Sequence, residues 1–140
     1  MKEYLQVEIA LENSLAIPIE QTREVLSKRR DEICPICGVA SAILGVINHR
    51  GKLLWVTDIN KVWQLTPPQK QIQPQDKLTI IVLKTQGKQI GAVVARLKGI
   101  ITLEPKNLKK SETILDVDAM LALLQTCLVK KQEQKLMVNL

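Results

Sequence analysis

Aromatic side chains are nearly absent from this sequence, which has no phenylalanine, one tyrosine and two tryptophans. Small β-barrels that bind nucleic acid usually stack the bases on exposed aromatic rings in a basic groove. Only Tyr4, Trp55 and Trp63 are available, and the apolar neighbours of both tryptophans predict at least partial burial. A stacking platform is therefore not expected. The core must be built from isoleucine, leucine and valine, whose β-branched members favour strands.

Catalytic groups are also scarce. The single histidine, His49, lies between Asn48 and Arg50 with no nucleophile near it in sequence, so a Ser/His/Asp or Cys/His arrangement is not indicated. No glycine-rich phosphate-binding loop follows a predicted strand. We therefore expect a protein that is not an enzyme and that uses no cofactor.

Three cysteines are too few for a disulfide framework. Cys34 and Cys37 have the two-residue spacing of half a zinc site or of a redox pair. Zinc would need two more ligands, and only Cys127 and His49 remain, at distant places without paired spacing. Structural cysteines and no metal site are the favoured interpretation, and the thiol or zinc alternative stays open.

No signal peptide precedes the first strand pattern, and no apolar run approaches the roughly 20 residues that cross a bilayer. A cytoplasmic location without direct membrane insertion is expected. The net charge of +6 comes from short basic clusters, of which 28–30 is the longest, and favours an acidic partner. A solvated surface is the simpler interpretation. A basic, nucleic-acid-binding β-barrel remains the alternative function.

Alternation of apolar and polar residues predicts many short strands, bounded by turn residues at Gly51 and at Gln86-Gly87. The predicted strands cover residues 5–12, 15–19, 42–47, 53–59, 78–83, 89–94 and 97–103, with a closing hairpin over 126–129 and 135–139. Helices are predicted over 20–27, from a cap at Asp58 to Leu65, and on the face formed by Val117, Met120, Leu121 and Leu124, capped by Asp116 or Ser111. Such spacing is typical of a barrel or sandwich.

Residues 66–76 contain three prolines and four glutamines, and proline cannot donate to a strand ladder. This segment is the predicted linker and the approximate subdomain boundary inside one domain spanning residues 1–140. Residues 33–39, with Pro35 and Gly38, are predicted as an irregular connector.

Two segments match a known sequence pattern. Residues 42–51 read Ala-Ile-Leu-Gly-Val-Ile-Asn-His-Arg-Gly and lead into an apolar strand ending in Asp58-Ile59. The second segment is residues 90–101, before Leu-Glu-Pro, and a further stretch over 17–25 precedes both segments, in the order of the pattern. Together they resemble the CheW-like family of chemotaxis coupling proteins. Trp55 stands where that family usually has proline, and Ala95 stands where it often has aspartate.

The resemblance implies two small five-stranded SH3-like β-barrels packed side by side, with short helices, an apolar groove between the barrels and terminal strands that can cross over. It implies an adaptor that joins the cytoplasmic tip of a methyl-accepting chemoreceptor to the regulatory domain of a CheA-type histidine kinase. By position it places Arg50 at the receptor-facing corner, flanked by Asn48 and His49. Thr22 and Glu24 fall in a second partner-facing stretch.

Physical chemistry is compatible with that role for Arg50. A guanidinium at a tight hairpin corner presents a planar fork that can grip a carboxylate or helix carbonyls. An internal pair of Arg50 with Asp58 or Glu24 is the alternative, and it is compatible with binding.

Overall fold

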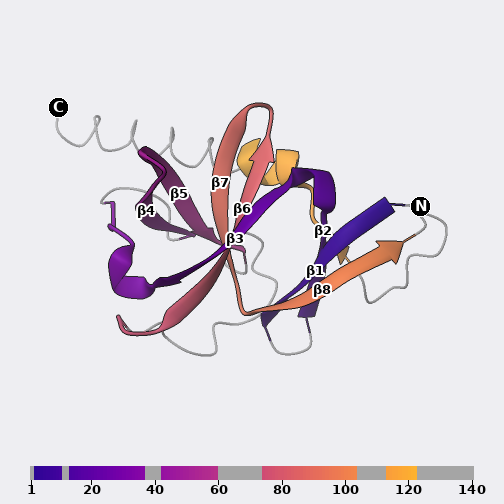
Figure 1. Cartoon of the computed structure of the whole chain (residues 1–140), viewed down its shortest axis with the longest axis horizontal. Helices are drawn as coiled ribbons and strands as arrows, with labels where there is room; N and C mark the ends of the chain where they lie inside the picture. The colour runs from indigo at the N-terminus through magenta and orange to yellow at the C-terminus, as the bar shows by residue number, and fades with distance from the viewer. Residues whose placement is uncertain (1, 11–12, 37–41, 60–73, 104–112, 123–140) are drawn as a thin grey trace, which may run out of the picture.

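The computed structural model describes residues 2–10, 13–36, 42–59, 74–103 and 113–122 (Figure 1). Within these residues no helix is long and apolar enough to cross a membrane. The elements, in chain order, are β1 (Lys2–Ala10), β2 (Asn13–Pro18), the 3₁₀ turn η1 (Ile19–Gln21), β3 (Thr22–Arg29), the 3₁₀ turn η2 (Arg30–Glu32), β4 (Ile43–His49), β5 (Lys52–Asp58), β6 (Lys77–Thr85), β7 (Lys88–Val94), β8 (Arg96–Leu103), β9 (Thr113–Ile114) and a helix that begins at residue 117.

The first sheet has the strand order β8-β1-β2-β9. β1 lies between β2 and β8 and is antiparallel to both, while β9 joins the far side of β2 in parallel. The start of the chain is therefore paired with strands that come after the whole of the second sheet. In Figure 1 these strands lie at the N-terminal side of the molecule.

The second sheet has the order β3-β6-β7-β5-β4. It curls, and the chain after β3 returns to β4, where Cys34 and Val46 form an antiparallel bridge with backbone hydrogen bonds of 2.8 and 2.9 Å. This bridge connects the segment that follows one edge strand to the other edge strand. The second sheet is thereby closed into a small barrel.

Two cores fill the fold, and β6 separates them. The barrel core lies inside the second sheet and contains Ile33, Leu44, Ile47, Leu54, Val56, Leu78, Ile80, Val82 and Val93. The inter-sheet core contains Leu5, Val7, Ile9, Leu15, Ile17, Ile43, Ile59, Ile81, Leu83, Ile90, Ala92, Val94, Leu115, Val117 and Met120. Because successive strand residues face opposite sides, β6 gives Ile80 to one core and Ile81 to the other. This explains why its residues 80–83 are all buried.

The predicted fold class is confirmed: the protein is mainly β, with two SH3-like subdomains. The predicted strands over 5–12, 15–19, 42–47, 53–59, 78–83, 89–94 and 97–103 each correspond to an observed strand, within a few residues at their ends. The second sheet has the five strands that the resemblance implies, and the first has four within the described part of the chain. The predicted closing hairpin over 126–129 and 135–139 and most of the linker over 66–76 lie outside the described residues.

The helix predicted over residues 20–27 is wrong. The 3₁₀ turn η1 ends at Gln21, and β3 then pairs with β6 from Thr22 to Arg29. Side chains along β3 alternate between half-buried and exposed, which is the period of a strand. The helix-forming residues in this stretch are overridden because the free edge of β6 supplies a hydrogen-bonding partner for the backbone.

The helix predicted around Val117 and Met120 is confirmed for residues 117–122. Asp116 caps it, as expected, since its Oδ1 accepts a hydrogen bond of 3.0 Å from the backbone N–H of Ala119. Both Val117 and Met120 belong to the inter-sheet core. For the helical turn predicted from Asp58 to Leu65, only the first residues lie in the described part, and Ile59 is helical.

One prediction concerns the ion pair that links β1 to β8. Arg96 donates to Glu8 Oε2 at 2.6 Å, between residues that are cross-strand partners. This hydrogen bond is the main cause that holds the pKa of the Glu8 carboxyl below its ordinary value; burial opposes it, and the charges of Arg96 and Lys98 add to it. Arg96→Ala should therefore raise the Glu8 pKa, measured by NMR titration of the carboxyl carbon.

The sign of the linked stability change follows from the direction of this shift. A folded-state pKa below the unfolded value stabilises the protein above the unfolded pKa, and the contribution is lost as the pH falls through the folded pKa. The stability difference between wild type and Arg96→Ala should therefore be larger at neutral pH than in acid. An unchanged Glu8 titration in the variant would contradict the assignment of Arg96 as the cause.

Candidate functional site

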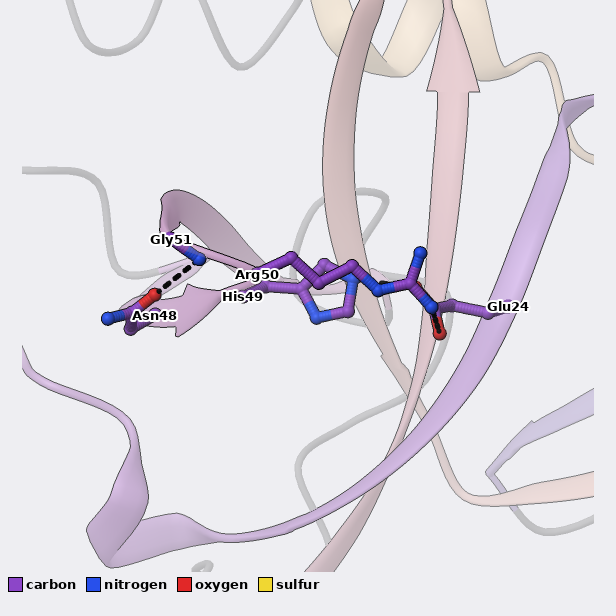
Figure 2. A network of polar contacts seen from close by, with 5 residues as sticks. All are labelled: Glu24, Asn48, His49, Arg50 and Gly51. Atoms are coloured by element: carbon purple, nitrogen blue, oxygen red, sulfur yellow. Dashed lines mark hydrogen bonds and ion pairs between the residues drawn. The ribbon is translucent and has the colours of Figure 1, made fainter.

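The β4–β5 hairpin turns through two residues, Arg50 and Gly51. Both have positive φ, 54° and 77°, as a type I′ turn requires, and glycine adopts this conformation without steric cost. Asn48 braces the turn because its Oδ1 accepts a hydrogen bond of 3.1 Å from the Gly51 backbone N–H (Figure 2). The turn sets the register in which His49 pairs with Lys52.

Opposite this turn, the carboxylate of Glu24 on β3 contacts two side chains of the hairpin, His49 and Arg50. The distance from His49 Nε2 to Glu24 Oε1 is 2.6 Å, and that from Arg50 Nη2 to Oε2 is 3.3 Å. Figure 2 shows the Arg50 side chain extending past the His49 ring toward this carboxylate. The two contacts thus use one carboxylate oxygen each.

The two contacts differ in their exposure to solvent. The side chain of His49 is 14% exposed, that of Glu24 is 25% exposed and that of Arg50 is 72% exposed. Since an exposed ion pair contributes only about 0–1 kcal/mol, the Arg50 contact adds little stability. The structure gives Arg50 a polar partner at one nitrogen among the described residues, and a guanidinium carries donors on three. The other guanidinium N–H groups can donate hydrogen bonds to carboxylate or carbonyl oxygens.

The site also has a place in the fold. β3 and β4 are the two edge strands of the second sheet. The Glu24–His49 contact crosses between them, as the Cys34–Val46 bridge does through the segment after β3. The contacts of Glu24 with His49 and Arg50 therefore lie at the seam where the barrel closes.

Four of the five predicted site residues come together here, and Thr22 does not join their contacts. The hydroxyl of Thr22 donates to the backbone carbonyl of Pro18 at 3.1 Å, at the start of β3. Of the two internal partners weighed for Arg50, the contact with Glu24 is found. The Glu24–His49 contact was missed from the sequence because its residues are 25 positions apart and no local pattern links them.

A shallow pocket of about 300 Å³ lies beside η1 and the first sheet. Its lining residues are Glu3, Tyr4, Pro18, Glu20, Gln21, Ile114, Leu115 and Asp116. Three carboxylates make it acidic, unlike the apolar groove that the resemblance implies.

The sulfur and metal candidates receive no support from the described residues. Cys34 is exposed, while Cys37 and Cys127 lie outside the described part. No group of three histidine, cysteine, aspartate or glutamate side chains suited to a metal is found in the part of the chain that the structure covers.

The aromatic residues give no stacking surface where they can be placed. Tyr4 is buried, and the partly buried Trp55 packs against the inter-sheet core. Trp63 lies outside the described residues.

Comparison with known proteins shows the family of this chain. The model of the CheW-like domain family matches residues 3–137. The chain belongs to the CheW-like domain family. The hairpin of Asn48, His49, Arg50 and Gly51 lies within the residues that this family model matches.

The scaffolding protein TtCheW from Thermoanaerobacter tengcongensis has a crystal structure similar to this chain, with a TM-score of 0.64 and 22% sequence identity. The match covers 80% of this chain and 76% of TtCheW. At this identity the likeness concerns the fold. No match was found among curated proteins.

Proposed function

We propose that this chain is a non-enzymatic cytoplasmic adaptor that couples the tip of a methyl-accepting chemoreceptor to the regulatory domain of a CheA-type histidine kinase. The family assignment supports a chemotaxis scaffold. One structural observation carries the finer proposal: Arg50 is 72% exposed at the hairpin corner and contacts Glu24 through one nitrogen.

The proposed receptor-facing surface consists of Asn48, His49 and Arg50 on the hairpin with Thr22 and Glu24 on β3. Arg50 supplies the charge-assisted contact, and Asn48 fixes the turn that presents it. On the same surface the Glu24 carboxylate contacts both Arg50 and His49. Binding at this surface requires no catalytic step, cofactor or metal.

The first test compares Arg50→Ala with a matched control, Arg96→Ala, in titrations against a receptor-tip fragment. Arg96 is 71% exposed and paired to a glutamate, as Arg50 is, but it lies on β8 in the other sheet. Loss of a charge-assisted hydrogen bond worth about 1.5–3 kcal/mol predicts a weakening of roughly 10- to 100-fold for Arg50→Ala. The control variant should stay within about twofold of wild type.

Two outcomes would contradict the proposal. Wild-type protein that binds neither the receptor tip nor the kinase regulatory domain at micromolar concentration would exclude the adaptor function. Equal weakening by Arg50→Ala and Arg96→Ala would show that net charge, not the corner, drives binding.

The nucleic-acid alternative makes a different prediction about salt. Binding through phosphates weakens steeply as the salt concentration rises, because counterions are released in proportion to the phosphates contacted. A contact built on one arginine should respond far less. A titration of the receptor tip and of single-stranded DNA at two salt concentrations distinguishes the two functions.

A further inference from the structure

His49 has a geometry that the proposed adaptor function alone does not explain. It is the single histidine of the chain, it is mostly buried, and its Nε2 contacts Glu24 at 2.6 Å. The exposed Arg50 holds the other oxygen of the same carboxylate at the longer distance of 3.3 Å. The short, sheltered contact and the long, exposed contact therefore share one acceptor group.

We propose that His49 is a positioning residue for Arg50. By holding Oε1 of Glu24, the imidazole orients the carboxylate so that Oε2 faces the guanidinium and keeps Arg50 extended at the corner (Figure 2). The statement that this serves receptor binding rests on the proposed function. The statement that His49 orders Arg50 concerns the free protein and stands on the contacts alone.

The energies of the two contacts explain why a third group is needed. A free arginine side chain has rotamer entropy worth about 2 kcal/mol, and an exposed ion pair gives back about 0–1 kcal/mol. Glu24 lies on an edge strand, and a glutamate side chain also loses rotamer entropy when it is held in one conformation. Without a second anchor both partners would sample other rotamers. The hydrogen bond from His49 removes that freedom from the acceptor.

The chemistry of the contact fixes which atom donates. An ionised carboxylate only accepts hydrogen bonds, so Nε2 of His49 must carry the hydrogen. A replacement at this position needs an N–H donor at the distance of Nε2 to do the same work. Glutamine places its amide nitrogen near that point, whereas the shorter asparagine places its amide near the position of Nδ1 and cannot reach Oε1.

This difference gives a matched pair of variants, His49→Gln and His49→Asn, each with and without Arg50→Ala. For receptor-tip binding we expect His49→Asn to weaken affinity about five- to tenfold, the loss of one hydrogen bond of about 1 kcal/mol. His49→Gln should stay within about twofold of wild type. In the Arg50→Ala background, His49→Asn should have no further effect.

A purely structural role gives another pattern. If His49→Asn weakens binding equally with and without Arg50, His49 does not act through Arg50 and the proposal is overturned. If His49→Gln weakens binding as much as His49→Asn does, the hydrogen bond to Glu24 is not what maintains the affinity, and the proposal is overturned. Thermal unfolding of both variants checks that they are folded. We expect both to fold, because the Cys34–Val46 bridge also joins the two edges of the second sheet.

A measurement on the free protein separates this proposal from the proposed function. In wild type and His49→Gln, the Nη hydrogens of Arg50 should exchange slowly enough with water to give NMR signals. In His49→Asn these signals should be lost. Ordered Arg50 signals in a protein that binds no receptor tip would support the positioning role and reject the partner. Arg50 signals unchanged by His49→Asn would reject the positioning role whatever the partner.

Discussion

Gly45→Ala should destabilise the protein by about 3 kcal/mol or more, from strain at its backbone angle and loss of neighbouring hydrogen bonds. Gly45 lies at a bulge in β4 with φ of 147°, a backbone conformation that residues other than glycine rarely adopt. A Cβ atom there would lie 2.1 Å from the backbone oxygen of Cys34. That oxygen accepts the 2.9 Å hydrogen bond from the Val46 N–H. The added methyl group would therefore break the bridge that closes the barrel.

Gly99→Ala is the control for the backbone angle. Gly99 has φ of 143°, close to that of Gly45, but nothing lies within 4 Å of its Cβ position. Strain alone should cost about 1–2 kcal/mol at this site. Urea unfolding measures the loss of unfolding free energy in each variant. The amount by which the loss for Gly45→Ala exceeds that for Gly99→Ala is the cost of the contact with Cys34. Equal losses at the two glycines would show that the bridge adds nothing.

Local patterns in the sequence predicted most of the fold. Alternation located seven strands, Asp116 was a correct helix cap, and Gly51 marked a two-residue turn between strands. β3 was missed because its residues favour a helix locally, whereas their pairing partners on β6, which make them a strand, lie 48 to 61 positions away in the sequence. The pattern of apolar residues also could not assign Ile80 and Ile81 to different cores.

The site was predicted less completely than the fold. The sequence placed Arg50, Asn48 and His49 together because they are neighbours in a turn, and the family resemblance added Glu24. The bond between His49 and Glu24 depends on how far the second sheet curls, since it joins the two edge strands. Sheet curvature is set by packing in three dimensions, and no residue spacing encodes it directly.

Ile80→Ala and Ile81→Ala should each destabilise the protein by about 2–5 kcal/mol, as expected for deleting a buried isoleucine side chain. Both residues lie on β6 and are 0% exposed, but Ile80 packs in the barrel core and Ile81 in the inter-sheet core. The inter-sheet core takes side chains from both sheets and from the helix that begins at residue 117. The two subdomains therefore share one core and should unfold together.

This sharing makes the hydrogen-exchange result for Ile81→Ala decisive. If the sheets form one cooperative unit, amides of β1 and of β7 should lose protection by the same free energy in both variants. Urea unfolding followed by fluorescence and by circular dichroism should give coincident single transitions. If Ile81→Ala instead lowered protection in β1 and β2 alone, the first sheet would be a separate unit. The second sheet would then fold without it, and the hairpin of Asn48 and Arg50 would depend on the barrel core alone.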